Sequence, residues 1–364
     1  MNILATLSSN NRRPINNSLK KVCLAIAYAN KDKKLKIFGL VEELKKDLSY
    51  EQLRSKEVKI LTLSSKNLIQ KIFKIRNIIS EKKIDIIQCA GFKQLIFFYL
   101  AIFNMNASPC IVMTDRTTDR WNGKFSTFLS KFILFFIRPY IHVLNTRHFN
   151  YLKSKKYLFK DLVMIPNGVE LFLENSKEIT DSKKDSFNVC YIKSIREDTG
   201  HDDIINLASL IKFSGIKILI HLIGEGSLYQ DFLKKVSKEE LEEVIKTYGE
   251  LEHSKALSIL RKMNLGITTS PIEMMPNFVL ECFSVGVPII GYKTAGVEDL
   301  IVDNKNGYLI EPGDNKAFFE KIVYLSKENS KLQELSKNSL KSASKYSVSN
   351  IGNELVKFYQ RILG

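Results

Sequence analysis

Two glutamates placed eight residues apart, Glu273 and Glu281, are the residues of this 364-residue chain best suited to bind a polar ligand. Glu273 follows a strand-like run at 265–269, and Glu281 lies within an apolar, helix-like segment at 277–285. A carboxylate only accepts hydrogen bonds, so the pair suits hydroxyl groups better than phosphates. The pair therefore predicts a site for a hydroxyl-rich ligand, such as a sugar with a ribose. The alternative is that both are ordinary surface glutamates, which is the usual state of this residue.

The segment around these glutamates has the element order of a nucleotide-binding α/β unit. A strand-like run at 289–292 follows the helix, and the small residues 294–296 predict a turn before Glu298. Ligands of parallel α/β sheets gather at the carboxyl ends of the strands. The amino end of the helix that begins near Asn277 adds a partial positive charge, which favours phosphate. We therefore expect these elements to surround a single nucleotide site.

Strand and helix patterns alternate along the whole chain, which predicts an α/β fold with parallel sheets. Thirteen strands are expected, at 2–7, 35–40, 58–63, 84–89, 110–114, 141–144, 162–165, 188–192, 217–223, 244–248, 265–269, 289–292 and 307–310. The length suits two domains better than one core. We place them at 1–168 and 187–346, joined by a polar linker at 169–186. Apolar residues at helical spacing predict a final helix over 347–364.

Fifteen residues after position 272 match a known signature in one register. They are Glu273, Met275, Pro276, Asn277, Leu280, Glu281, Gly286, Pro288, Gly296, Glu298, Asn306, Gly307, Pro312, Gly313 and Asp314. This set resembles the donor site of the large bacterial group 1 (family 4) glycosyltransferases, retaining enzymes of the GT-B fold. The resemblance implies two Rossmann-like domains facing a cleft, with the final helix packed back on the first domain. It also implies a nucleotide-sugar substrate and neither a metal nor another cofactor.

The resemblance further implies a role for each matched residue. Glu281 would accept hydrogen bonds from the ribose hydroxyls. Glu273, with the backbone amides of Met275 and Asn277, would hold the hydroxyls of the transferred sugar. The other predicted donor-binding residues are Pro276, Gly296, Glu298, Tyr248 and Gly249, of which the last two lie in a turn whose backbone usually contacts the base.

The diphosphate-binding segment departs from the family pattern. Ser194 and Thr199 occupy the two positions where relatives carry Arg and Lys. Because departure of a diphosphate without a metal needs cationic stabilisation, we expect Lys193 or Arg196 to supply it. With Glu273, these two cations are the predicted catalytic residues.

Two loops of the first domain also depart from the family pattern. Arg12 and Arg13 stand in place of a glycine-rich loop, and Asp115 and Arg116 stand where many relatives have a histidine. We expect all four on the acceptor and phosphate side of the cleft. Arg12, Arg13 and Arg116, together with Arg120, would bind an anionic acceptor or phosphate there, or would lie on solvated loops.

Charge is divided unevenly between the two halves. Residues 1–165 contain 30 Lys and Arg against 11 Asp and Glu, whereas the remainder contains 25 against 28. A basic first domain predicts an anionic partner: a membrane surface, a lipid diphosphate, an anionic glycan or nucleic acid. Nucleic acid is disfavoured, since no helix-turn-helix, zinc or RNA-binding pattern accompanies the charge. A genome-wide composition bias is the alternative, although it should enrich both halves alike.

An aromatic and basic segment at 125–143 offers one way to meet such a partner. Its apolar residues include Phe125, Phe128, Leu129, Phe132, Ile133, Phe135 and Phe136, and Lys124, Lys131 and Arg138 accompany them. The basic residues interrupt the run, so it does not read as a bilayer span. A core helix is one interpretation. We favour a helix that lies on an anionic membrane surface.

The resemblance implies a glycosyltransferase, and the charge and the aromatic segment predict that it is cytoplasmic and attached peripherally to the inner face of the cell membrane. Five scattered cysteines without a CxxC pair, and an amino terminus without a signal-like apolar core, fit that compartment. The enzyme would move a hexose or N-acetylhexosamine from a UDP- or GDP-sugar, with retention, onto a lipid-linked or surface-polysaccharide acceptor, as in lipopolysaccharide or capsule synthesis. The alternatives are a catalytically silent GT-B partner subunit and, third, a sugar-nucleotide epimerase.

Overall fold

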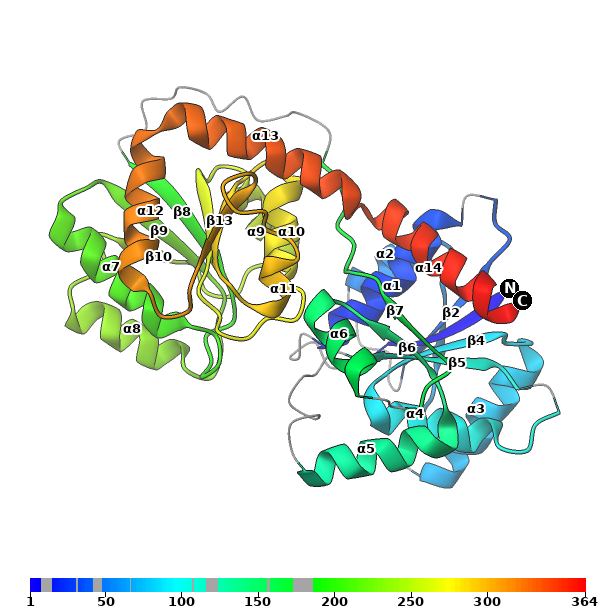
Figure 1. Cartoon of the computed structure of the whole chain (residues 1–364). Helices are drawn as coiled ribbons and strands as arrows, with labels where there is room; N and C mark the ends of the chain where they lie inside the picture. The colour runs from blue at the N-terminus through cyan, green and yellow to red at the C-terminus, as the bar shows by residue number, and fades with distance from the viewer. Residues whose placement is uncertain are drawn as a thin grey trace. The chain divides into compact units, whose positions relative to one another are not determined.

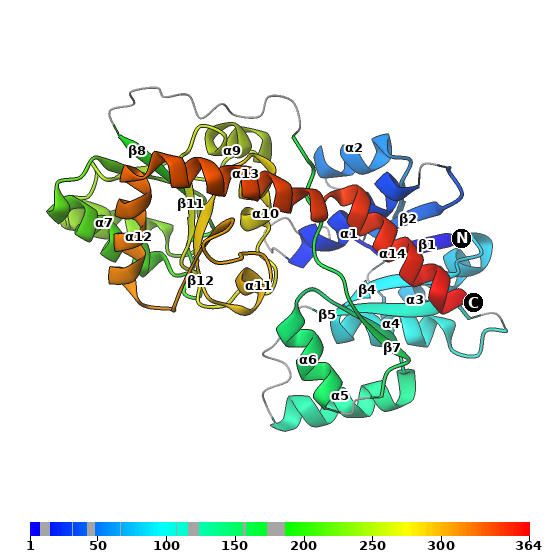
Figure 2. The same ribbon diagram turned by 45° about the horizontal axis from the view of Figure 1, so that its top comes forward.

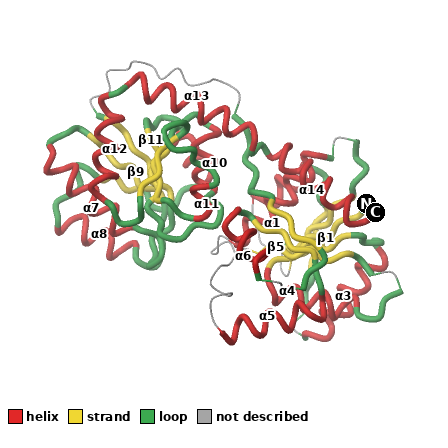
Figure 3. Tube along the Cα trace, viewed as in Figure 1, coloured by secondary structure: helices red, strands yellow, loops and turns green. Residues whose placement is uncertain are grey.

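The chain forms two compact units in the computed structural model. The structure describes residues 1–7, 15–30, 32–41, 48–65, 67–106, 108–115, 124–155, 158–172 and 186–364. Unit 1 comprises Met1–Gly168 and Tyr346–Gly364, and unit 2 comprises Val169–Lys345. Helices and strands alternate in both units (Figures 1 and 3). Most of the predicted linker, residues 173–185, lies outside the described residues.

Unit 1 contains a seven-stranded sheet in the order β3-β2-β1-β4-β5-β6-β7, and all its paired strands are parallel. The strands are β1 (Asn2–Thr6), β2 (Lys36–Val41), β3 (Lys59–Thr62), β4 (Ile86–Ala90), β5 (Cys110–Asp115), β6 (Tyr140–Val143) and β7 (Asp161–Met164). The helices are α1 (Ile15–Ala29), α2 (Leu48–Ser55), α3 (Leu68–Glu81), α4 (Gly91–Ile102), α5 (Lys124–Ile137), α6 (Thr146–Ser154) and α14 (Val348–Leu363).

The sheet of unit 1 is buried on both faces, as its apolar strands require. Successive residues of a strand point to opposite faces. Ile3 accordingly packs in a core with α1 and α14, and Leu4 packs in a second core with α3 and α4. Right-handed crossovers explain the division, because the strand order reverses beside β1 and places the later helices on the other face.

Helix α14 follows unit 2 in the sequence but packs along α1 in unit 1 (Figure 2). Gly352 makes the close approach possible, since a Cβ there would lie 1.8 Å from the carbonyl oxygen of Ala25. The buried hydroxyl of Tyr359 donates to Gln88 Oε1 at 2.7 Å, and Arg361 pairs with Asp161. The helix is therefore an integral part of unit 1.

Unit 2 contains a six-stranded parallel sheet in the order β10-β9-β8-β11-β12-β13. The strands are β8 (Phe187–Ile192), β9 (Ile218–Ile223), β10 (Ile245–Thr247), β11 (Leu265–Thr268), β12 (Ile289–Tyr292) and β13 (Gly307–Ile310). The helices are α7 (His201–Ser214), α8 (Tyr229–Lys238), α9 (His253–Leu260), α10 (Asn277–Ser284), α11 (Ala295–Glu298), α12 (Asn315–Lys327) and α13 (Asn329–Lys345).

The predicted α/β class with two Rossmann-like sheets is confirmed, and each of the thirteen predicted strands is present. One local prediction was wrong. Residues 294–296 were expected to form a turn, but Thr294 is the N-cap of the short helix α11. Ala295, the first residue of α11, is a strong helix former. The amides of Val297 and Glu298 donate to the Thr294 carbonyl, which are the i+3 and i+4 hydrogen bonds of a helix.

No helix in the described part of the chain combines the length and the apolar character that a membrane crossing requires.

Candidate functional site

The carboxyl edge of the unit 2 sheet brings together most of the predicted site residues. Strand β8 pairs with β9 on one side and β11 on the other, so the strand order reverses between β8 and β11. At such a reversal, the loops after the two strands leave to opposite faces and open a crevice for ligands. The loop at 193–200 follows β8, and the loop at 269–276 follows β11.

The two loops are tied to each other by hydrogen bonds. The Thr269 hydroxyl donates to the carbonyl of Gly200 at 2.7 Å, and the Ser270 hydroxyl lies 3.4 Å from the carbonyl of Asp198. Gly200 has a left-handed φ of 72°, and a Cβ there would lie 2.0 Å from the Thr269 carbonyl oxygen. A glycine at this position is therefore needed for the close contact.

Lys193 and Glu273, two of the three predicted catalytic residues, form an ion pair across these loops. Their side chains are only 23% and 13% exposed. The residues lie 80 positions apart in the sequence, and the adjacency of β8 and β11 places them side by side. A partly buried lysine and carboxylate at a strand-order reversal provide one cation and one acceptor for a ligand.

Ser194 and Thr199 bind the backbone of the protein. The Ser194 hydroxyl donates to the Glu225 carbonyl at 2.8 Å. The buried Thr199 hydroxyl accepts from the Arg196 amide at 3.0 Å and donates to the Arg196 carbonyl at 2.7 Å. The Tyr191 phenol, whose pKa is raised by burial, donates to the Thr199 carbonyl. These residues fix the shape of the loop and leave Lys193 and Arg196 as its cations.

Arg196 has a buried Nε without a hydrogen-bond partner in the described structure. A buried guanidinium nitrogen without a partner is costly, so a ligand acceptor at this position would stabilise it.

Helix α10 presents Glu281 and its own amino end to the same region. Pro276 is the N-cap, and its side chain makes no capping hydrogen bond. Glu281 lies one turn after Asn277, so both residues share one face of the helix. The Glu281 carboxylate, 13% exposed, lies 3.1 Å from Nε2 of the exposed His253 at the start of α9. Met275 and Pro276 are buried beneath the loop.

Gly296 and Thr294 line the adjoining edge of the loop. The Gly296 amide donates to the Glu273 carbonyl at 2.9 Å, and a Cβ at Gly296 would lie 2.3 Å from the backbone of Met274. Only glycine fits this contact. The Thr294 hydroxyl is buried without a hydrogen-bond partner in the described structure, and Glu298, half-buried, follows on α11.

Tyr248 and Gly249 follow β10 and lie beside the loop after β9. The Tyr248 hydroxyl lies 2.8 Å from Nδ1 of His221, and the two rings are stacked, so this side chain is held against the sheet. The Gly249 carbonyl accepts from the Gly224 amide at 2.8 Å. The Glu225 carboxylate lies over Gly249, where a Cβ would approach it to 2.7 Å. Glu225 was not predicted from the sequence, although the glycines flanking it at 224 and 226 signal a tight loop.

Asp115 is the one predicted acceptor-side residue that the structure describes. It ends β5, is buried, and its Oδ2 lies 3.1 Å from Nε2 of His148, whose side chain is fully buried. Arg12, Arg13, Arg116 and Arg120 lie outside the described residues. His148 was not predicted, and its only signal is Asn145, which caps the amino end of α6.

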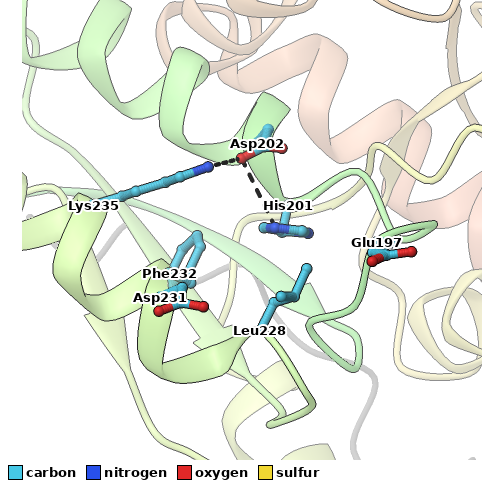
Figure 4. Close-up of a pocket in the computed structure, with 7 residues that line it drawn as sticks. All are labelled: Glu197, His201, Asp202, Leu228, Asp231, Phe232 and Lys235. Atoms are coloured by element: carbon cyan, nitrogen blue, oxygen red, sulfur yellow. Dashed lines mark hydrogen bonds and ion pairs between the residues drawn. The ribbon is translucent and has the colours of Figure 1, made fainter.

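A separate pocket of about 380 Å³ lies between α7 and α8 and contains none of the predicted site residues (Figure 4). Its lining residues are Glu197, His201, Asp202, Leu228, Asp231, Phe232 and Lys235. Lys235 donates to Asp202 at 2.6 Å, and this hydrogen bond lowers the pKa of the Asp202 carboxyl. The pair crosses from α8 to α7 at the rim of the pocket.

Four of the five cysteines are buried. Burial raises the pKa of the Cys23 thiol to about 12 and also raises the pKa values of Cys89, Cys190 and Cys282. These four thiols stay protonated at neutral pH and are poor nucleophiles. In the part of the chain that the structure describes, no three His, Cys, Asp or Glu side chains are grouped so that they could hold a metal ion.

The sequence of unit 2 matches a known protein family. Residues 173–342 match the family described as glycosyl transferases group 1. Unit 2 is therefore similar to the glycosyl transferases group 1 over nearly all of its length. The matched range includes Lys193, Arg196, Glu273, Glu281 and the other residues of the carboxyl edge.

A curated glycosyltransferase is similar to about half of the chain. The capsular polysaccharide biosynthesis glycosyltransferase CapM of Staphylococcus aureus is 26% identical over 184 residues, which are 49% of this chain and 47% of CapM. The chain thus spans about half the length of the curated relatives that it matches.

Two solved structures are similar over nearly the whole chain. Anabaena Alr3699/HepE in complex with UDP and glucose has a TM-score of 0.80 at 15% identity and covers 99% of this chain and 100% of its own. S. aureus TarM, in complex with Fondaparinux, alpha-GlcNAc-glycerol and UDP, has a TM-score of 0.76 at 14% identity and covers 98% and 99%. The predicted GT-B fold is confirmed.

Proposed function

We propose that the chain is a retaining glycosyltransferase that moves a hexose or N-acetylhexosamine from a UDP-sugar onto a surface-polysaccharide or lipid-linked acceptor. The observation that carries the proposal is the Lys193–Glu273 ion pair at the strand-order reversal of unit 2, which is similar to the glycosyl transferases group 1. UDP is favoured over GDP because HepE and TarM were each solved with UDP. An acceptor in polysaccharide synthesis is favoured by the similarity to CapM.

The cations and carboxylates of the edge would divide the work of transfer between them. Lys193 and Arg196 would bind the diphosphate and stabilise the charge that develops as it leaves. The Glu273 carboxylate would exchange its bond with Lys193 for hydrogen bonds from the hydroxyls of the sugar. The backbone amides of Met275 and Asn277 would donate to the same sugar. Glu281 would accept hydrogen bonds from the ribose. The Lys193 and Glu273 charges balance each other in the ion pair, so donor binding would exchange one set of charge-assisted bonds for another.

Retention needs no enzymic nucleophile in this proposal. The leaving phosphate would take the proton of the attacking acceptor hydroxyl on the same face of the sugar that the phosphate departs from. The protein then contributes positioning and charge stabilisation, which are the larger effects in group transfer. A lipid-linked acceptor would present its hydroxyl at a bilayer, so peripheral attachment to the inner face of a membrane accompanies the proposal.

A panel of UDP- and GDP-sugars, screened first by thermal shift and then for hydrolysis and transfer, tests the proposal. A donor that binds only the folded state raises its melting temperature, and at one hundred times its Kd the gain is about 2.7 kcal/mol. We expect one UDP-sugar to raise the melting temperature of the chain, and we expect Glu281→Ala to lose this increase. An equal shift in Glu281→Ala would show that the ribose assignment is wrong.

A catalytically silent GT-B subunit is the second candidate. It is favoured by Ser194 and Thr199, which bind backbone groups at the positions where the family resemblance places cations. Hydrolysis of the stabilising UDP-sugar by the purified chain alone would exclude it. Binding without hydrolysis or transfer to any acceptor would favour it.

A further inference from the structure

Helices α3, α4 and α5 of unit 1 expose an unusual amount of apolar surface. Helix α4 packs between α3 and α5 on one face of the sheet (Figures 1 and 2). Ten of the eighteen exposed large hydrophobic side chains among the described residues belong to these three helices, with exposures from 37% to 67%. Exposed apolar side chains in this number on three adjoining helices indicate an interaction site, whereas single exposed residues do not.

The orientation of α5 shows that the exposure is not a poorly packed core. Leu134 is fully buried and Ser130 is 5% exposed, so the helix has a well-packed inner face. Phe128, Phe132 and Phe136 are all more than half exposed on the other side. The rings of Phe132 and Phe136 contact each other edge to face, with centroids 4.9 Å apart. The helix therefore buries a serine and presents phenylalanines to solvent.

The same three helices carry a one-sided charge. Among their described side chains, Lys71, Lys74, Arg76, Lys93 and Lys131 are basic, and Glu81 is acidic. Arg76 donates to backbone carbonyls at the end of α4 and so joins α3 to α4. Lys93 on α4 and Lys131 on α5 are exposed, as are the apolar side chains of the same helices.

This charge distinguishes between possible occupants. A two-fold interface with a second copy would bring two identical surfaces together and oppose like charges across it. An anionic bilayer offers an apolar interior to the phenylalanines and negative headgroups to the lysines. The charge and the apolar surface are thus complementary to the same partner.

A pocket of about 290 Å³ lies at the ends of α4 and α5, next to this surface. Its aromatic walls include Tyr99, Phe103 and Tyr140, and Arg138 and Lys160 are its cations. Lys160 Nζ lies 5.5 Å from the centre of the Tyr140 ring. An aromatic wall beside two cations suits a phosphate ester that carries an apolar chain.

We propose that α3, α4 and α5 form a docking surface for an anionic lipid bilayer, with Arg138 and Lys160 holding the phosphate of one lipid. The phenylalanines of α5 enter the boundary between headgroups and acyl chains, and Lys93 and Lys131 face the headgroups. The proposal extends the single interfacial helix predicted from the sequence to three helices and a pocket. It rests on the peripheral membrane attachment in the proposed function and identifies the surface that would make it. Vesicle binding needs neither a donor nor transfer, so failure of the docking surface can be told apart from failure of the donor site.

Cosedimentation of the full chain with vesicles tests the proposal. We expect binding to vesicles of phosphatidylcholine with one quarter phosphatidylglycerol, and much weaker binding to phosphatidylcholine alone or at 0.5 M salt, where charges are screened. Phe132→Ser with Phe136→Ser should reduce binding about tenfold or more, because each ring contributes apolar burial. Lys93→Glu should reduce it about fivefold or more on anionic vesicles, since each basic residue contributes about 1 kcal/mol.

Matched controls come from unit 2. Phe213 on α7 is 88% exposed, and Lys238 ends α8. Phe213→Ser and Lys238→Glu should bind vesicles as the original chain does. Arg138→Ala with Lys160→Ala should lower binding to anionic vesicles, and inorganic phosphate at matched ionic strength should not release the protein.

Three results would overturn the proposal. The first is equal binding by the Phe132/Phe136 and Lys93 variants and the original chain. The second is a chain that does not bind vesicles and forms a dimer, which Phe132→Ser with Phe136→Ser converts into a monomer. That result would assign the surface to a second copy. The third, release by inorganic phosphate, would assign the pocket to a free anion. If the phenylalanine variant fails to fold, Lys93→Glu decides alone.

Discussion

The two units share one architecture, a doubly wound parallel sheet, but differ in where their distinctive residues lie. Unit 2 places an ion pair, an unpartnered guanidinium nitrogen and an unpartnered threonine hydroxyl at the carboxyl edge of its sheet. At the end of β5, unit 1 has Asp115 buried against His148, and its unusual residues lie on the outer faces of three helices. The scaffold fixes where loops converge, whereas the outer helical faces vary without cost to the core. The comparison teaches that donor chemistry and partner binding can be separated by mutation.

The largest expected effect is that of Glu273→Gln, which tests whether unit 2 alone carries the donor chemistry. Loss of a carboxylate that binds the transferred sugar should lower turnover by about 10²–10³-fold, as removal of one preorganised group does in other transfer sites. Steady-state transfer measures the change, and vesicle binding should stay the same. Glu311→Gln is the matched control, because Glu311 pairs with Lys293 in the same unit on an exposed surface. Unchanged turnover in Glu273→Gln would contradict the assignment.

The next effect concerns the cation that replaces the usual diphosphate-binding pair. Lys193→Met should weaken binding of the donor and of UDP about tenfold to a hundredfold, because charge-assisted bonds to phosphate are among the strongest in proteins. Calorimetric titration with UDP measures this loss, with Lys293→Met as the control. Arg196→Met should act in the same direction. If neither Lys193→Met nor Arg196→Met affects UDP binding, both residues are removed from the mechanism.

The third prediction tests whether unit 1 can be destabilised without any change in the stability of unit 2. Gly352→Ala places a Cβ against the Ala25 carbonyl and should destabilise unit 1 by about 1–3 kcal/mol, the usual cost of overpacking. Hydrogen exchange resolved by peptide should become faster in unit 1 and stay unchanged in unit 2. Asn353→Ala, at the neighbouring exposed position, should have little effect. Equal acceleration in both units would mean that the units do not unfold separately.

The smallest expected effect concerns the rim of the pocket between α7 and α8. The pKa of Asp202 is lowered by its bond from Lys235, so the pair stabilises the fold above the unfolded pKa of aspartate. That contribution is lost as pH falls through the lowered pKa. Both side chains are at least half exposed, so Lys235→Ala should cost no more than about 0.5 kcal/mol at pH 7. The melting temperatures of Lys235→Ala and the original chain should converge as the pH is lowered from 7 to 2. The melting temperature of Lys238→Ala should match that of the original chain at every pH.

The strands were predictable because their cause is local. The inner strands of both sheets are short runs of largely buried apolar residues, and their neighbours along the chain are polar or glycine-rich. The turn predicted at 294–296 was wrong because small residues are compatible with both a turn and a helix start. The bonds to the Thr294 carbonyl, which form α11, cannot be read from residue types alone.

The site was predictable as a set of residues but not as a set of contacts. The spacing of Glu273 and Glu281 indicates a helix start after a strand, which the structure contains. The partner of Glu273 depends on β8 lying beside β11, which is a property of the sheet order. The exposure of Phe132 could not be predicted either, because the sequence does not say which side of α5 faces the core. In the structure, Ser130 and Leu134 lie on the buried side.

The contact between α14 and α1 has a consequence for how the protein is made. Unit 1 is complete only when residues 346–364 have joined it, and unit 2 lies between the two parts. At about 5–20 residues per second, a ribosome needs roughly 10–40 seconds to add the intervening residues. Throughout that time the apolar groove of unit 1 that receives Ile351, Leu355 and Tyr359 is uncovered. The first unit to emerge is therefore the last to finish folding, and nascent chains should need protection of this groove until synthesis has passed α14.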